Sequence, residues 1–383
     1  MESKNPVPFT LHIRLTRFCN AGCDYCSSWQ ESPDNKMSVD SYLTGLHFIY
    51  EFWKRVGLDV THLTIEYVGG EVLLLSKTEI SACVNGARKF FADRGINVVD
   101  GVQSNLIGSS ERVDFLFDLF ENRVGTSIDS FSDKRKFKGS AEKYRVFFME
   151  SEQKVSKRLP SKVPGIFTMD SDTVEHAILE VQKAMDESRD LMIRPVFGGG
   201  SEVKLPSVGD IGYVYEETLD RWWMKSSVRL EPMYSLVRKR LSNRLGAFKG
   251  ENFDYCSFQS NCTLRSLSME PNGDLFICQD MADANREALG NALNGEFDFE
   301  KWKLINQRPY RMDADCYACP YFKECQGGCL LKSLESGGGI FGKSTHCGAW
   351  KLMFAKIDQL IDSSDEAEML MWIEEIEQRA IAA

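Results

Sequence analysis

The sequence has little of what marks a membrane-bound or exported protein. No segment reaches the ~18 consecutive apolar residues that a membrane-spanning helix needs. The first ten residues, MESKNPVPFT, contain no apolar stretch of the kind that a signal peptide carries. These absences argue against a membrane partner and predict a cytoplasmic protein.

Positive charge is also scarce. The 46 Lys and Arg residues are outnumbered by 56 Asp and Glu residues, which gives a formal net charge of -10. An acidic surface excludes a nucleic-acid backbone as the main partner. A local basic run, Lys134, Arg135, Lys136 and Lys138, is expected to be a solvated loop, with a local basic groove as the alternative.

The pattern of apolar residues predicts an α/β fold. Hydrophobic residues make up 43% of the chain, enough for a large core. Strand-like runs alternate with longer segments of helical spacing, and the runs are 11–16, 63–68, 95–104, 123–129, 163–169 and 191–196. Six strand–helix units joined by right-handed crossovers form a partial (β/α)6 TIM-like barrel. Its functional residues are expected at the C-terminal ends of the strands.

Helix signals and composition divide the chain further. Helices are expected at 38–56, 76–93 and 172–186, the first capped by Ser38 and Gly57. After residue 197 the composition changes, and cysteines become frequent from Tyr255 onward. We therefore expect a partial barrel at 8–245, a cysteine-rich domain at 250–350 and a helical tail at 351–383.

Cysteine is what the chain has in quantity, with 12 residues. A reducing cytosol does not sustain a disulfide framework, so we expect most of them to be metal ligands. The first group, Cys19, Cys23 and Cys26, has the spacing C-x3-C-x2-C directly after the first strand. Three thiolates on a [4Fe–4S] cluster leave one iron open to a ligand. A structural zinc site instead wants four ligands, and unrelated core cysteines are not expected at this spacing.

This motif resembles that of the radical S-adenosylmethionine (SAM) superfamily, over roughly residues 8–200. In that family the open iron binds SAM, and an electron from the cluster releases a 5′-deoxyadenosyl radical that abstracts hydrogen from substrate. The resemblance implies a flavodoxin- or ferredoxin-type electron donor. It also implies cofactor contacts by Tyr25, Gly69, Gly70, Glu71, Gln103, Asn105, Ser127 and Asp129. Simple packing of the aromatic ring and strand-end capping are the alternatives for these residues.

Eight further cysteines are enough for two complete four-cysteine sites. With the sequence C-x10-G-x4-C that begins at Cys262, they resemble the SPASM domain, which carries two auxiliary [4Fe–4S] clusters. The resemblance implies three clusters in all, and it groups Cys256, Cys262, Cys278 and Cys329 as auxiliary set I and Cys316, Cys319, Cys325 and Cys347 as auxiliary set II. Zinc ribbons are the alternative, because short CxxC pairs also suit zinc. Cys83 remains, in an expected helix, as a core residue.

A fully ligated auxiliary cluster has no open iron, so electron transfer and a net oxidation of the substrate are expected. SPASM enzymes commonly modify peptides. The leading hypothesis is therefore an oxidase that forms an intrapeptide crosslink, a cyclophane-type carbon–carbon or carbon–heteroatom bond, in a ribosomal precursor peptide. The chain leaves little room for a separate peptide-recognition domain, so the barrel mouth and the cysteine-rich domain are expected to grip the peptide.

Three alternatives stay open. The first is a radical dehydrogenase or epimerase of a sugar or aminoglycoside. The second is a sulfatase-type protein maturase, because the spacing of Cys256, Cys262 and Cys278 is close to the cysteine spacing of those enzymes. Those enzymes have an acidic base directly after the third cysteine, where this chain has Gln279. Asp280, one position later, is a candidate proton acceptor or a salt-bridge partner. The third is an electron-transfer scaffold without SAM chemistry.

Metal content separates clusters from zinc. Anaerobic reconstitution is expected to give about twelve iron atoms per chain with broad visible absorption, because three four-iron clusters are expected. Metal analysis and an absorption spectrum measure this. Bound zinc without visible absorption would contradict the cluster assignment.

Overall fold

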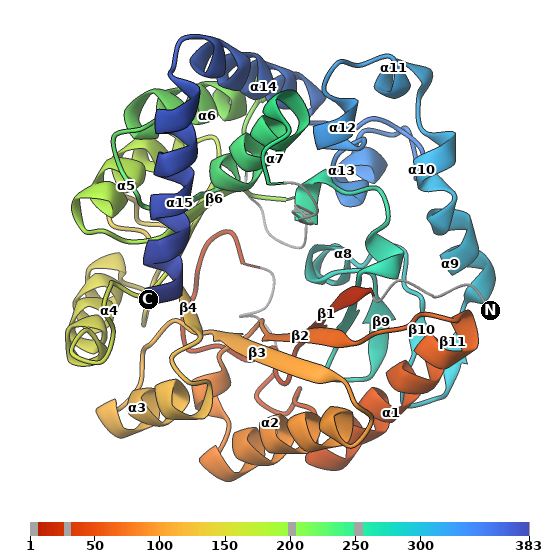
Figure 1. Cartoon of the computed structure of the whole chain (residues 1–383). Coiled ribbons are helices and arrows are strands. Elements are labelled where there is room, and N and C mark those ends of the chain that lie inside the picture. Colours follow the sequence, from red (N-terminus) through yellow and green to blue (C-terminus); the bar gives the residue numbers. More distant parts are fainter. Residues whose placement is uncertain (1–6, 27–31, 198–203, 249–255, 383) are drawn as a thin grey trace.

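The computed structural model describes residues 7–26, 32–197, 204–248 and 256–382. Six parallel strands alternate with helices, as expected for an α/β fold (Figure 1). The strands are β1 (Pro8–Ile13), β2 (His62–Tyr67), β3 (Asn97–Gln103), β4 (Val124–Ser127), β5 (Gly165–Met169) and β6 (Leu191–Pro195). The helices between and after them are α1 (Val39–Val56), α2 (Lys77–Ala92), α3 (Ser110–Leu119), α4 (Ala141–Val155), α5 (Val174–Asp186) and α6 (Val208–Trp222).

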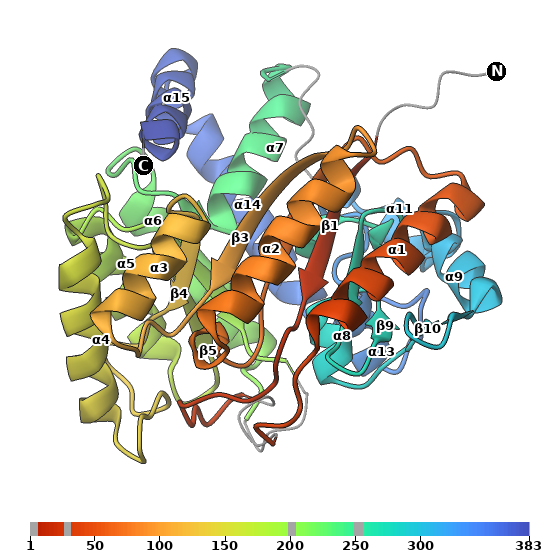
Figure 2. The same cartoon turned by 90° about the horizontal axis from the view of Figure 1, so that it is seen from below.

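Local sequence explains the helix ends and the packed faces. The Ser38 hydroxyl accepts a hydrogen bond from the Ser41 N–H at the start of α1, and Gly57 ends α1 in the left-handed conformation. Alternate residues of β1 and β2 are buried, because one face of the strands packs against α1 and α2 (Figure 2). Both expected caps and all six expected strands are therefore confirmed.

The sheet does not stop at six strands. It continues through β7 (Leu230–Glu231) beside β6 and through β8 (Ser266–Met269) beside β1, with β9 (Asp274–Phe276), β10 (Gly290–Asn291) and β11 (Glu296–Phe297) beyond β8. β8 pairs with β1 in parallel, with Thr10 opposite Ser266. The cysteine-rich region thus extends the barrel sheet through backbone hydrogen bonds, although the expected division into domains remains a prediction.

Helices complete the second half of the chain. They are α7 (Met233–Leu245), α8 (Gln279–Asp283), α9 (Phe299–Asn306), α10 (Arg308–Arg311), α11 (Ala314–Tyr317), α12 (Phe322–Cys325), α13 (Leu330–Glu335), α14 (Cys347–Asp362) and α15 (Glu366–Ala382). The expected pair of tail helices is present as α14 and α15, but the expected boundary at 350 falls inside α14. Among the described residues, every helix is too short or too polar to cross a bilayer.

Aromatic contacts join the last two helices to the barrel. Trp350 of α14 stacks on Tyr215 of α6 with the ring centroids 5.4 Å apart. Trp372 of α15 meets Trp222 of α6 edge-on at 4.6 Å. These large buried rings make α14 and α15 part of the barrel wall, where Figure 1 shows them beside α6.

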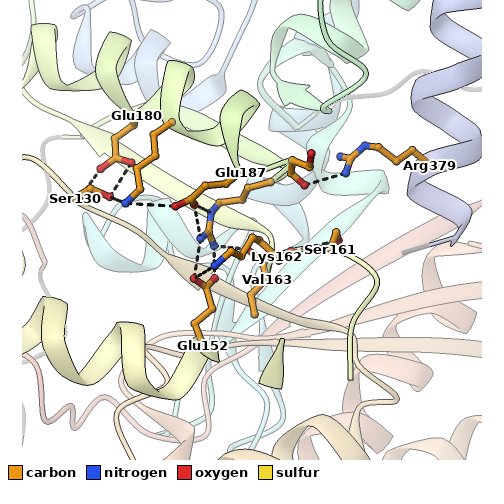
Figure 3. Close-up of polar contacts among 11 residues, drawn as sticks. Ser130, Glu152, Ser161, Lys162, Val163, Glu180, Glu187 and Arg379 are labelled. Carbon is orange, nitrogen blue, oxygen red and sulfur yellow. Dashed lines mark hydrogen bonds and ion pairs between the residues drawn. The ribbon is translucent and has the colours of Figure 1, made fainter. Parts of the chain in front are cut away.

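A buried ion-pair network ties α4 and α5 to the start of β6 (Figure 3). The Arg189 guanidinium donates to Glu152 at 2.9 Å, to Glu187 at 2.9 Å and to the Val163 carbonyl at 2.8 Å. Burial opposes ionisation of Glu152, but Arg189 outweighs it and lowers the pKa of that carboxyl. Arg379 of α15 pairs with Asp190 next to this network. Residues of α4, of α15 and of the segments just before β5 and β6 therefore meet in one largely buried polar region.

Replacing Arg189 with Met should destabilise the protein strongly. It removes the bidentate cation of the buried Glu152 carboxylate and leaves only the more exposed Lys162 ammonium, 3.4 Å away, so the loss should approach but not exceed the ~3–5 kcal/mol that breaking a buried pair typically costs. Equilibrium denaturation measures the change. The control is Lys89→Met, which breaks an exposed pair with Asp93 and should cost at most ~0.5 kcal/mol. Equal losses in the two variants would contradict the role of the network.

Candidate functional site

The carboxyl ends of β1 to β6 open on one pocket. Parallel strands bring their C-terminal ends to the same rim, so side chains far apart in sequence meet there. Every strand from β1 to β6 supplies lining from itself or from the loop after it, including Cys19, Gly69, Gln103, Ser127, Thr168 and Arg194. The expected position of the functional residues is therefore confirmed for this pocket.

The first cysteine group lies in the loop after β1, and all three thiols line the pocket. The loop is held from the side by the segment after β4. Ala21 forms a β-bridge with Phe137, and the Gly22 N–H donates to the Lys136 carbonyl at 2.8 Å. Burial, and then the Glu71 carboxylate, raise the pKa of the Cys19 thiol to about 12. A thiolate here needs a cationic partner, and iron supplies one.

Steric crowding explains why positions 69 and 70, just before Glu71, are both glycine. Both glycines have positive φ, 75° and 58°. A Cβ on Gly70 would collide with the Thr16 carbonyl oxygen, and one on Gly69 would collide with the Arg14 side chain. Only glycine therefore lets this loop pass so close to the loop that carries the cysteines.

Glu71 holds neighbouring loops together. Its carboxylate accepts hydrogen bonds from the Leu73 N–H at 3.0 Å, the Ser104 hydroxyl at 2.8 Å and the Asn105 N–H at 2.7 Å. Its own N–H donates to the Phe18 carbonyl at 2.8 Å. Burial raises the pKa of Glu71, although these hydrogen bonds oppose the shift. Both oxygens are engaged within the protein, so Glu71 positions the pocket walls.

The remaining expected contacts divide into two groups. Gln103 and Asn105 line the pocket, and their amides donate to the Ser127 hydroxyl at 3.1 Å and to the Asn20 side-chain oxygen at 2.7 Å. Asp129 does not line the pocket. Its carboxylate instead accepts from the Ser132 N–H at 2.8 Å and caps the following loop. Strand-end capping, the alternative considered above, describes its contacts.

The sequence argument missed Arg135, and the expectation of a solvated basic run is wrong there. Arg135 is 7% exposed, lines the pocket and donates to the Tyr25 hydroxyl at 2.7 Å. Its Nε is buried and has no hydrogen-bond partner in the described chain. Its neighbours Lys134 and Lys136 pair with carboxylates. A buried guanidinium with an unused donor suits an anionic ligand group such as a carboxylate.

Asp280 lies in the pocket but is not isolated. Arg194 of β6 donates to both of its carboxylate oxygens, at 2.7 and 2.6 Å. The salt-bridge interpretation of Asp280 is therefore correct, and the pair forms part of the pocket wall. Burial lowers the pKa of nearby His12 to about 4, which keeps its imidazole neutral. Sequence did not mark His12, because it alternates with buried Leu11 and Ile13 in an ordinary strand pattern.

The positions of the eight later cysteines are consistent with the two expected sets, although the ligands of each set remain predictions. Those of auxiliary set II line one partly open pocket together with Trp350. In set I, burial, then Asp280 and then the neighbouring Cys256 and Cys329 raise the pKa of Cys278, so these thiols lie within electrostatic reach of one another. In the described residues no three His, Cys, Asp or Glu side chains converge as around a single ion. The set II thiols surround a space, as the ligands of a four-iron cluster do.

A buried ion cluster fixes the cysteine-rich region against the barrel. Arg14, 0% exposed, pairs with Glu270 at 3.0 Å and with Asp283 at 2.8 Å. Arg17 pairs with the same two carboxylates at 3.0 Å each. Arg14 and Arg17 lead into the first cysteine loop, while Glu270 follows β8 and Asp283 ends α8. The cluster thereby sets the first cysteine group against α8, whose residues close the far wall of the pocket.

Comparison with known proteins places this architecture. No family model and no curated protein matches the chain. The solved structure of the anaerobic sulfatase-maturating enzyme anSMEcpe with bound AdoMet superposes with a TM-score of 0.71, over 93% of this chain and 99% of that one, at 18% identity. The fold is that of a radical SAM enzyme. SuiB of Streptococcus suis bound to S-adenosylmethionine shares the radical SAM fold, with a TM-score of 0.57 at 15% identity over 89% of this chain and 77% of SuiB.

The resemblance expected from the cysteine motifs is thus confirmed for the fold. anSMEcpe is a radical SAM SPASM enzyme. The number of clusters and the ligands of each remain predictions for this chain.

The Gly70→Ala variant should destabilise the protein by at least ~1–2 kcal/mol, since left-handed strain costs about that much and the methyl group also meets the Thr16 carbonyl. Equilibrium denaturation measures the change. Gly22→Ala is the matched control in the cysteine loop, because a Cβ there meets nothing within 4 Å. If both variants are equally stable, the steric argument fails.

Proposed function

We propose that the chain is a radical SAM/SPASM oxidase that modifies a peptide. The observation that carries the proposal is the pocket itself. It brings three cysteines beside buried Arg135 on one side and residues of α8, next to auxiliary set I, on the other. A [4Fe–4S] cluster on Cys19, Cys23 and Cys26 would supply the electron that cleaves bound SAM, and so the radical that takes hydrogen from the substrate.

The chain's own residues fit SAM in several ways. Arg135 offers a buried donor without a protein partner, which suits the SAM carboxylate. Ser127 adds a hydroxyl at the end of β4, and Tyr25 adds an aromatic ring held by Arg135. The close passage at Gly69 and Gly70 exposes backbone groups that suit the SAM ammonium. These residues bind and orient the cofactor and exclude water around its reactive end.

The substrate would occupy the part of the pocket between the first cysteine group and α8. Its wall is polar, with the Arg194–Asp280 pair and Gln279 beside Val196 and Phe197. Asp280 and Cys278 are two residues apart, so a substrate radical formed here would lie near auxiliary set I. Clusters on the eight later cysteines would accept the electron that a net oxidation releases.

A peptide is favoured over a small molecule by the solved structures. anSMEcpe has been solved with AdoMet and the Kp18Cys peptide, and SuiB with its precursor peptide SuiA. We therefore propose an intrapeptide crosslink of the cyclophane type in a ribosomal precursor peptide, with a flavodoxin- or ferredoxin-type donor. A sulfatase-type maturase is the less favoured product class, because Gln279 replaces the acidic residue after Cys278 and Arg194 holds Asp280.

Anaerobic incubation of the reconstituted enzyme with SAM, dithionite and a precursor peptide encoded beside its gene tests this function. We expect 5′-deoxyadenosine and a peptide lighter by a pair of hydrogen atoms, detected by mass spectrometry. Cys19→Ala should abolish both products. Cys347→Ala should still form 5′-deoxyadenosine but not the oxidised peptide, because the auxiliary electron acceptor is impaired.

Two results would contradict the proposal. Absence of 5′-deoxyadenosine in the wild-type reaction would favour an electron-transfer scaffold. Formation of 5′-deoxyadenosine with an unchanged peptide but an oxidised sugar alcohol would favour the small-molecule alternative.

A further inference from the structure

Arg308 is an unusual buried residue between the two auxiliary cysteine sets. It begins the short helix α10 and is 1% exposed. Its Nη2 donates to the Gly327 carbonyl at 3.0 Å, the Gly328 carbonyl at 3.4 Å and the Ser333 hydroxyl at 2.9 Å. Its Nη1 donates to the Ile340 carbonyl and, at 3.4 Å, to the Gly342 carbonyl. The side chain thus gathers three separate segments around one guanidinium.

The carbonyls that Arg308 binds join the two sets directly. Gly327 and Gly328 lie in the segment between Cys325, a member of set II, and Cys329, a member of set I. Both glycines have positive φ, 82° and 71°. A Cβ on Gly327 would collide with the Met312 sulfur and lie 3.3 Å from Arg308 Nη2. The segment therefore needs glycine to turn between the sets while it presents its carbonyls to Arg308.

The charge of Arg308 has no carboxylate to balance it. Arginine stays protonated in proteins, and a buried charge is costly unless an opposite charge lies near. Arg14 and Arg189 meet this need with Glu and Asp partners, but within the described chain no carboxylate forms an ion pair with Arg308. The groups in electrostatic reach are thiols from both sets, Cys262, Cys329, Cys316 and Cys325. Its Nε is also buried without a partner in the described residues.

We propose that Arg308 is a positioning residue shared by the two auxiliary sites. Its hydrogen bonds hold the Cys325–Cys329 segment, and its charge compensates the thiolates of both sets and raises the reduction potential of both clusters. The physical reason is that a nearby fixed positive charge favours the state with one more electron. The inference rests on the auxiliary clusters of the proposed function and adds that one cation tunes the two clusters together.

The test uses the full chain with Cys19, Cys23 and Cys26 all replaced by Ala, so that only auxiliary clusters remain. Into it are placed Arg308→Met, Arg308→Lys and, as a control, Arg311→Gln on the exposed side of the same helix. We measure iron per chain and the midpoint potentials of both clusters. The potentials come from redox titration followed by electron paramagnetic resonance. We expect Arg308→Met to lower both midpoint potentials. Arg308→Lys, which keeps the positive charge, should leave both potentials close to those of the parent protein. Arg311→Gln should change neither potential.

Each other outcome is decisive. Unchanged potentials at full iron content, or a shift in one cluster alone, would overturn the shared role. If the midpoint potentials fall as far in Arg308→Lys as in Arg308→Met, the role of charge is overturned. Loss of iron from both variants would overturn it as well. If Arg308→Met alone loses iron, wild-type potentials in Arg308→Lys support the proposal and lowered ones overturn it. A parent protein that binds no iron would overturn the auxiliary clusters of the proposed function, and this inference with them.

Discussion

The buried cluster of Arg14 and Arg17 with Glu270 and Asp283 is the interaction on which the site depends. It connects the chain just before the first cysteine group to the strand and helix that open the cysteine-rich region. Without this cluster, β8 could still pair with β1, but α8 would lose the ion pairs of Asp283 that hold it at the pocket wall. Charges that are this deeply buried are stabilising only when their geometry is satisfied, so the cluster favours one relative placement of the two regions.

The charged side chains of the pocket lie in two separate places. Arg135 stands beside the first cysteine group, where a cofactor carboxylate would lie, while the Arg194–Asp280 pair faces the side nearer to auxiliary set I. The carboxylate oxygens of Glu71 are already hydrogen-bonded to two backbone N–H groups and the Ser104 hydroxyl. Glu71 therefore positions the pocket walls and does not face a ligand. The arrangement places a cationic group at one end, where the proposed SAM carboxylate would lie, and a paired, overall neutral wall at the other. Among the described residues, a substrate in the second part would therefore meet paired charges.

Sequence alone was enough for the features that short-range pattern encodes. The alternation of strands and helices, the caps of α1, the cysteine spacings and the glycine pair before Glu71 all follow from neighbours within a few residues. What it could not supply are contacts over long separations. Arg135 stands in a lysine-rich run that looks solvated, and its burial depends on distant contacts, among them the Ala21–Phe137 bridge and the rings of Tyr25 and Tyr144. The pairing of Arg14 with Glu270, of β8 with β1, and of Asp280 with Arg194 likewise has no local signal.

The interleaving of the two auxiliary sets has a consequence for biosynthesis. Set I takes its last thiol from Cys329, and set II takes its last from Cys347, at the first turn of the helix that packs on α6. Both sets are therefore complete only after the ribosome has made all six barrel strands and most of the chain, later than Glu270 and Asp283, the partners of Arg14. Under the proposed function, iron would fill the auxiliary sets only at this late stage of synthesis. Until then the cysteine thiols of the nascent chain, 12 in this sequence, need protection from oxygen.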